Sequence, residues 1–121
     1  MQITQKNFYK KLLGRVGEAK AVEFLKKQGY LVLEKNYKTR LGEIDIIVKK
    51  DDTIVFVEVK TRSSDSCGSP SEAVGYEKQR KYAKVAEEYL LKHKIFDQSC
   101  RFDVIEIINE DINHIIDAFC V

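Results

Sequence analysis

Two runs of strand-forming residues stand only two positions apart, and this spacing constrains the fold more than any other feature of the chain. Residues 43–50 (EIDIIVKK) and residues 53–61 (TIVFVEVKT) are both rich in Ile, Val and Phe, and Asp51 and Asp52 separate them. Strands joined by so short a connection pair antiparallel as a hairpin. A two-residue turn and a four-residue turn at this point give the same register. We therefore expect one specific antiparallel pairing in the middle of the chain.

The expected register sets acidic side chains against each other. It places Asp45 opposite Glu58 and Glu43 opposite Lys60. Directly opposed side chains have Cβ atoms about 4.5 to 5.5 Å apart, and two carboxylates about 4 Å apart repel by about 4 kcal/mol at an effective dielectric constant of about 20. A hard divalent cation would remove this repulsion, since Mg²⁺ takes oxygen ligands and keeps water or phosphate in its remaining positions. Lys60 would then stand where it can orient or deprotonate a water, or stabilise charge developing on a phosphorane.

An ordinary solvent-exposed surface is the alternative explanation of the same charges. Glu43 and Lys60 would then form a weak cross-strand ion pair. Side chains alternate between the two faces of a strand, so three apolar residues share the face that carries the acids; these are Ile47, Ile54 and Phe56. They predict that a helix covers this face, where unpaired charge would be costly.

The rest of the chain predicts two helices and three further strands. Residues 7–28 have apolar residues at helical spacing (Phe8, Leu12, Val16, Ala19 and Val22), with Asn7 as the expected N-cap and Gly29 as the stop. Before the hairpin we expect a strand over 30–37 and a basic connection over 38–41. After it we expect a loop over 62–70 and a helix over 71–94, whose apolar stripe is Tyr82, Val85, Ala86, Tyr89 and Leu90. Two strands follow, over 101–108 and 114–119. This order of helix, three strands, helix and two strands predicts a sheet with helices packed on it.

Length, cysteine content and charge limit the class of protein. A chain of 121 residues is expected to form one domain over residues 1–121. Its three cysteines are widely spaced, which indicates a reducing cytoplasm, and we expect neither a signal peptide nor a membrane span. Residues 1–62 hold 14 Lys and Arg against 8 Asp and Glu, an excess suited to binding phosphates, although a solvated helix face would explain many of these lysines equally well.

Several segments together resemble the PD-(D/E)xK nuclease superfamily, and specifically its YraN-type branch, which is similar to archaeal Holliday junction resolvases. The resemblance covers most of the chain and rests on the segments GRVGEAKAVEFLKKQGY, LEKNYKTRLGEIDIIV, VFVEVKTR, GSPSEAVGYEKQRK, RFDVIEI and HIIDAF. It implies an α/β restriction-endonuclease-like core, with a mixed sheet flanked by helices. It also implies a nuclease dependent on Mg²⁺ or Mn²⁺.

The resemblance implies a role for each residue of the motif. Asp45, Glu58 and the carbonyl of Val59 would bind the metal, and Lys60 would handle the attacking water. Glu18 matches a helix-one glutamate that adds to the metal site. Apart from the resemblance, Glu43, on the same face of the strand as Asp45, is a candidate supporting residue. The residue before Asp45 is Ile44 where the motif's name has proline, a change that leaves these ligands in place.

Glu18 is a candidate site residue even without the resemblance. Its neighbours at helical spacing are Ala21, Val22 and Leu25, so it borders the side of the helix expected to be packed. An acid at such a border requires a positive partner. A metal and an ion pair with Arg15 are both open interpretations.

Three basic residues are candidates for binding nucleic acid. Lys78 lies four residues before Tyr82, so its stem can pack on the helix while its ammonium reaches a phosphate, or it simply reaches solvent. Arg40 and Arg62 flank the hairpin at the end that carries the acids, where phosphates would lie, and each could equally be an ordinary surface arginine.

Two functions follow from these residues. The first is a cytoplasmic, metal-dependent hydrolase of DNA phosphodiesters, acting at branched or other non-duplex structures, for which a homodimer would suit cutting of two strands. The second is a non-catalytic nucleic-acid-binding module that serves a DNA repair or recombination partner. Binding with a steep salt dependence but without cleavage would select the second.

Overall fold

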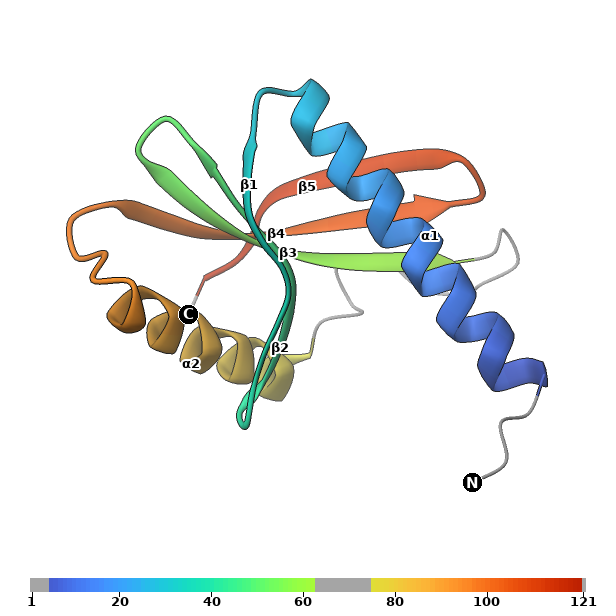
Figure 1. Cartoon of the computed structure of the whole chain (residues 1–121), viewed down its shortest axis with the longest axis horizontal. Coiled ribbons are helices and arrows are strands. Elements are labelled where there is room, and N and C mark those ends of the chain that lie inside the picture. The colour runs from blue at the N-terminus through green and yellow to red at the C-terminus, as the bar shows by residue number, and fades with distance from the viewer. Residues whose placement is uncertain (1–4, 63–74, 121) are drawn as a thin grey trace.

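A five-stranded mixed sheet lies between two helices (Figure 1). The computed structural model describes the backbone of residues 5–62 and 75–120 and the side chains of residues 11–62 and 75–120. In chain order the elements are α1 (Gln5–Lys27), β1 (Leu31–Thr39), β2 (Gly42–Lys50), β3 (Thr53–Arg62), α2 (Tyr76–Lys92), β4 (Ser99–Ile108) and β5 (Asp111–Phe119). The expected α/β class and the order of its elements are confirmed.

The strands lie in the sheet in the order in which they occur in the chain, β1-β2-β3-β4-β5. Every neighbouring pair is antiparallel except β3 and β4, which are parallel. A parallel pair requires a crossover connection, and α2 lies within it. The turn after β2 pairs Lys50 with Thr53, as expected from the two-residue spacing.

Each face of the sheet carries its own apolar core. The α1-side core comprises Ala21, Val22, Leu25, Tyr30, Ile46, Val48, Val55, Val57, Ile105 and Ile107. The α2-side core comprises Ile44, Ile47, Ile54, Phe56, Tyr82, Val85, Ala86, Tyr89 and Val104. The alternation along β3 from Ile54 to Val57 sends successive side chains to opposite cores, as strand geometry requires. The expectation that a helix covers the face of Ile47, Ile54 and Phe56 is confirmed.

The apolar stripe expected on the first helix is partly wrong. Leu12 and Val16 are 49% and 44% exposed, and the buried face is formed by Ala21, Val22 and Leu25. The helix also begins before Asn7, which therefore does not cap it, and β1 continues through residues 38 and 39, where a connection was expected. The loop expected over 62–70 and the first residues of the second expected helix lie largely outside the described residues.

The part of β2 that carries Glu43 and Asp45 does not pair with β3. The last pair of the ladder is Ile46 with Val57, and Glu43 lies opposite Lys38 on β1. The expected opposition of Glu43 and Lys60 is therefore wrong, and Asp45 and Glu58, although their side chains interact, do not pair in the ladder. Residues two apart on a strand normally share a face, yet Ile44 packs in the α2-side core and Ile46 in the α1-side core. We attribute this change of side to a strong local twist of β2, made feasible because β3 no longer constrains it.

Helix α1 lies very close to β3 at Gly17. A Cβ atom at this position would lie 2.0 Å from Oγ1 of Thr61 and 3.3 Å from its Cβ. Only glycine allows this approach without a shift of the helix. Because Glu18 is the next residue, this contact also determines how near its carboxylate lies to the end of β3.

A buried ionic cluster joins the β4–β5 hairpin to the end of α1. The side chain of Asp103 is fully buried and accepts hydrogen bonds from Arg101 Nε at 3.0 Å and from the backbone N–H of Asp117 at 2.9 Å, while His114 Nε2 lies 2.7 Å from its other oxygen. Arg101 also donates to the hydroxyl of Tyr30 at 2.7 Å. Burial raises the pKa of Asp103, but the hydrogen bonds from His114 and Arg101 outweigh it and hold the pKa below its ordinary value.

Candidate active site

Asp45 lies at the point where β2 and β3 separate, and it is tied to β3 by one hydrogen bond. The backbone N–H of Val59 donates to Asp45 Oδ2 at 2.8 Å. This bond fixes the carboxylate beside Glu58. Burial, followed by the charge of Glu58, raises the pKa of Asp45 to about 8, even though the Val59 bond acts in the opposite direction.

Glu58 is the centre of a group of polar side chains that we call the Glu58 cluster: Glu58, Lys60, Lys78 and Tyr82. The ammonium groups of Lys60 and Lys78 lie 3.2 Å and 3.1 Å from Oε1 of Glu58. The hydroxyl of Tyr82 donates to Oε2. Helix α2 thus supplies two residues, one turn apart, that hold both oxygens of a buried carboxylate on β3.

The two lysines of the Glu58 cluster differ in their protonation behaviour. Burial, together with the nearby Lys78, lowers the pKa of Lys60. For Lys78 burial acts in the same direction, but the contacts with Lys60 and Glu58 outweigh it and raise its pKa. Lys60 is therefore the one of the pair that loses its proton more easily, a property required of a general base.

Glu18 and Glu43 meet at the side chain of Asn36 on β1. With its amide oriented to satisfy its neighbours, the Asn36 nitrogen donates to Glu18 at 3.1 Å and 3.2 Å and to Glu43 at 3.3 Å. Burial and the charge of Glu43 raise the pKa of Glu18, although hydrogen bonds with Asp45 and Asn36 act against this rise. No ion pair between Glu18 and Arg15 occurs among the described residues, so the proposed alternative partner is not the one found.

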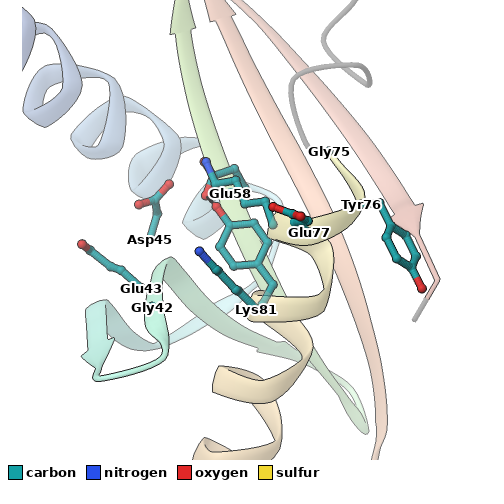
Figure 2. A pocket seen from close by; sticks show the side chains of 10 residues that line it. Gly42, Glu43, Asp45, Glu58, Gly75, Tyr76, Glu77 and Lys81 are labelled. Atoms are coloured by element: carbon teal, nitrogen blue, oxygen red, sulfur yellow. Dashed lines mark hydrogen bonds and ion pairs between the residues drawn. The ribbon is translucent and has the colours of Figure 1, made fainter.

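Two hollows open beside these acids. The α2-side hollow, of about 730 Å³, is lined by residues that include Glu43, Asp45, Glu58, Lys78 and Lys81. Figure 2 shows Lys81 reaching from α2 into this hollow toward the carboxylates of β2, while Tyr76 points away from Asp45. The α1-side hollow, of about 420 Å³, includes Arg15, Glu18, Lys35, Asn36 and Asp45 in its lining.

Of the predicted phosphate-binding arginines, neither lines these hollows. Arg62, at the end of β3, pairs with the buried Glu106 at 3.4 Å. Arg40 is exposed in the turn between β1 and β2. The structure thus brings together Glu18, Glu43, Asp45, Glu58, Lys60 and Lys78, and leaves both arginines at the edge of the group.

The donor chemistry of the group fits a hard divalent cation. Asp45 is partly buried and Glu58 is buried, and burial together with the charge of Glu58 raises the pKa of Asp45, so its anion would be stabilised by a nearby cation. Mg²⁺ needs only one or two carboxylates because water and phosphate fill its other positions. Within residues 11–62 and 75–120, no three His, Cys, Asp or Glu side chains are close enough to enclose a metal alone.

Sequence reasoning missed three residues of this site. Tyr82 and Lys81 lie on α2; Tyr82 was predicted only as part of the apolar stripe, and Lys81 was not singled out. The signal available for Tyr82 was its spacing of four from Lys78, which places both on one side of the helix. Asn36 carries a left-handed backbone conformation (φ 53°) within β1, which single-residue patterns do not reveal.

Comparison with known proteins places the whole of this site within one family. Neither described helix has the length of apolar sequence that spans a bilayer. The chain is 53% identical over 115 residues to a UPF0102 protein of Alkaliphilus oremlandii, covering 90% of this chain and 98% of that one. It is also 48% identical over 106 residues to a UPF0102 protein of Persephonella marina, covering 88% and 91%. The model of the uncharacterised protein family UPF0102 matches residues 17–107, and the chain therefore belongs to the UPF0102 family.

Proposed function

We propose that this protein is a metal-dependent nuclease that hydrolyses DNA phosphodiester bonds, and that its core is of the restriction-endonuclease-like type. One observation carries the proposal: Asp45 and Glu58 lie side by side at the edge of an open hollow, with Lys60 in contact with Glu58. Two adjacent acids and a lysine of lowered pKa form a set suited to hydrolysis of a phosphate ester.

The residues of the site divide the work of such a reaction. Asp45 and Glu58, with the carbonyl of Val59 and with Glu18 nearby, would hold Mg²⁺ or Mn²⁺. The bound ion would polarise the phosphate and acidify a water. Lys60, in its neutral amine form, would accept the proton of the attacking water as the water oxygen bonds to phosphorus; one ester P–O bond breaks, and the leaving oxygen takes a proton from solvent.

The rest of the Glu58 cluster keeps the carboxylate in place. Lys78 and Tyr82 hold opposite oxygens of Glu58, so the carboxylate cannot rotate freely. Preorganised ligands of this kind reduce the reorganisation needed when substrate binds. The preference for branched or non-duplex DNA rests on the resemblance to junction resolvases.

Isothermal titration of Mn²⁺ into the wild type and into Asp45→Ala tests the site. We expect saturable binding in the wild type and loss of binding in the variant. Asp52→Ala is the matched control: Asp52 is an exposed acid in the turn between β2 and β3, and this variant should bind Mn²⁺ as the wild type does. The same proteins are then incubated with Mn²⁺ and linear, forked, flapped and four-way DNA. Intact DNA throughout would contradict the proposed activity.

A binding module without turnover is the second candidate, and one observation favours it. Both oxygens of Glu58 already have partners within the protein, namely Lys60, Lys78 and Tyr82. A carboxylate satisfied in this way can be a structural element of a DNA-binding surface used by a repair or recombination partner. DNA binding in the same experiment, without metal binding or cleavage, would select this function.

A further inference from the structure

Asp45 lies on the boundary between the two hollows. It belongs to the lining of both the α2-side hollow and the α1-side hollow, and no other residue is common to the two linings. The hollows extend from Asp45 in different directions, one toward α2 and the other along the side of α1 and β1. A substrate phosphate beside Asp45 therefore has space on two sides.

Each hollow contains at least one basic side chain that forms no ion pair within the described residues. Lys81 in the α2-side hollow is exposed and forms no ion pair within the described residues, in contrast to its neighbour Lys78, which is bound to Glu58. Arg15 and Lys35 in the α1-side hollow are likewise exposed and unpaired in the described part of the chain. Cations without partners beside a group of acids are available to bind an anionic ligand.

The lining of each hollow suits a sugar-phosphate chain better than a compact ligand. Volumes of about 730 Å³ and about 420 Å³ are within the usual size for binding sites. Both linings combine acids with bases, and the acids Glu77 and Glu23 also lie among the bases of the α2-side and α1-side hollows. This arrangement allows a metal-bound phosphate at the acids and free phosphates at the bases.

We propose that a single nucleic acid strand crosses Asp45 from one hollow to the other, with Lys81 binding a backbone phosphate on one side and Arg15 and Lys35 binding one on the other. The proposal rests on the proposed function and specifies it: the site takes an internal phosphodiester of an unpaired strand. A site restricted to chain ends would need one hollow closed, and both are open as far as residues 11–62 and 75–120 define them.

Salt-dependent binding tests the two sides separately. The probe is a fluorescein-labelled oligothymidylate of about 16 nucleotides, followed by anisotropy in Ca²⁺ with its integrity checked on a gel. Loss of one phosphate contact lowers the slope of log affinity against log salt by about 0.7, so the wild type should lose about 2.6-fold more affinity than Lys81→Ala between about 50 mM and about 200 mM salt. Arg15→Ala should behave in the same way.

Matched controls and the double variant make the result decisive. Lys84→Ala on α2 and Lys20→Ala on α1 remove exposed lysines outside both hollows and should leave the slope unchanged. The double variant of Lys81 and Arg15 should lower the slope by about 1.4. The proposed path is overturned if only one of Lys81→Ala and Arg15→Ala lowers the slope of log affinity against log salt, or if the control variants lower it as much.

Cleavage of circular DNA separates this proposal from the proposed function. In Mn²⁺ we expect a closed single-stranded circle to be opened as readily as a linear strand of the same sequence is cut. A circle that stays intact while the linear strand is shortened from its ends overturns the path but leaves the nuclease. If neither DNA is cut while both single variants lower the binding slope, the nuclease proposal fails and the strand path is supported.

Discussion

Replacing Gly17 by alanine tests the close approach of α1 to β3. The new methyl group would lie 2.0 Å from Oγ1, 3.3 Å from Cβ and 3.5 Å from Cγ2 of Thr61. Rotation of Thr61 can move its hydroxyl, but the contact with its Cβ stays tight and β-branched side chains have few rotamers. Helix α1 must therefore shift, and Glu18 with it.

The magnitude follows from two opposing effects. Alanine in place of glycine stabilises a helix interior by about 1 kcal/mol, and overpacking typically costs about 1 to 3 kcal/mol. Gly14, one turn earlier in α1, has no atom within 4 Å of an added Cβ. Gly14→Ala thus gains the helix stabilisation without any overpacking cost. Because both variants gain the same helix stabilisation, their unfolding free energies should differ by the overpacking cost, about 1 to 3 kcal/mol, with Gly17→Ala the less stable.

Urea denaturation of both variants measures this difference directly. Thr61→Ala removes Oγ1 and Cγ2 but keeps Cβ, so adding it to Gly17→Ala should recover part of the loss, and the double-mutant cycle measures the coupling between the two positions. If Gly17→Ala proves as stable as Gly14→Ala, the helix does not approach the strand as described, and the placement of Glu18 near Asp45 loses its basis.

Three further substitutions test the site and the fold. Tyr82→Phe leaves the buried Glu58 without its hydroxyl donor and should lower the unfolding free energy in urea by about 1 to 3 kcal/mol, whereas Tyr76→Phe, at an exposed position, should not. Asp103→Asn removes the charge opposite Arg101 and should cost about 3 kcal/mol at neutral pH. Because the pKa of Asp103 is lowered by folding, its contribution is present above the ordinary carboxyl pKa and disappears as pH falls through the folded value, so wild type and variant should converge in acid. Asp45→Asn should have the opposite pH dependence in metal-free buffer. Because the folded pKa of Asp45 is about 8, ionisation of its carboxyl destabilises the wild type increasingly from about pH 4 to about pH 8. The variant should therefore be more stable than the wild type at alkaline pH, by at most about 6 kcal/mol, and equally stable in acid. Equal stability of Asp45→Asn and wild type across this range would contradict the burial of that carboxylate.

Local pattern was sufficient to predict the elements and one of their pairings. The two-residue spacing at Asp51 and Asp52 specified the turn and the register from Ile46 to Lys50, because a short turn leaves no other pairing. The stripe on α2 was also predicted, since a helix packed on a sheet repeats its apolar residues at a strong period. Glycine at position 29 ends α1 with a positive φ, as expected.

The errors arose where tertiary contacts override local pattern. Leu12 and Val16 have helical spacing but lie beyond the part of α1 that packs on the sheet, so their apolar character did not predict burial. The register of the hairpin could not reveal that β2 pairs with β3 only from Ile46 onward, while the residues before it pair with β1 alone. Tyr82 binds Glu58 across the crossover connection, a contact that no sequence spacing reports.

The parallel ladder between β3 and β4 has a consequence for the rate and order of folding. Its first pair, Thr53 with Ser99, joins residues about 46 positions apart, whereas the β1–β2–β3 meander and the β4–β5 hairpin close over short turns. Closing the long loop carries the larger entropic cost and slows formation of the ladder. Lys78 and Tyr82 lie inside that loop, so we expect Glu58 to meet these two partners when the two halves of the sheet join, whereas Lys60 lies on the same strand as Glu58. We therefore expect substitutions of these two residues to accelerate unfolding more than they slow folding, with the carboxylates assembled in the last step.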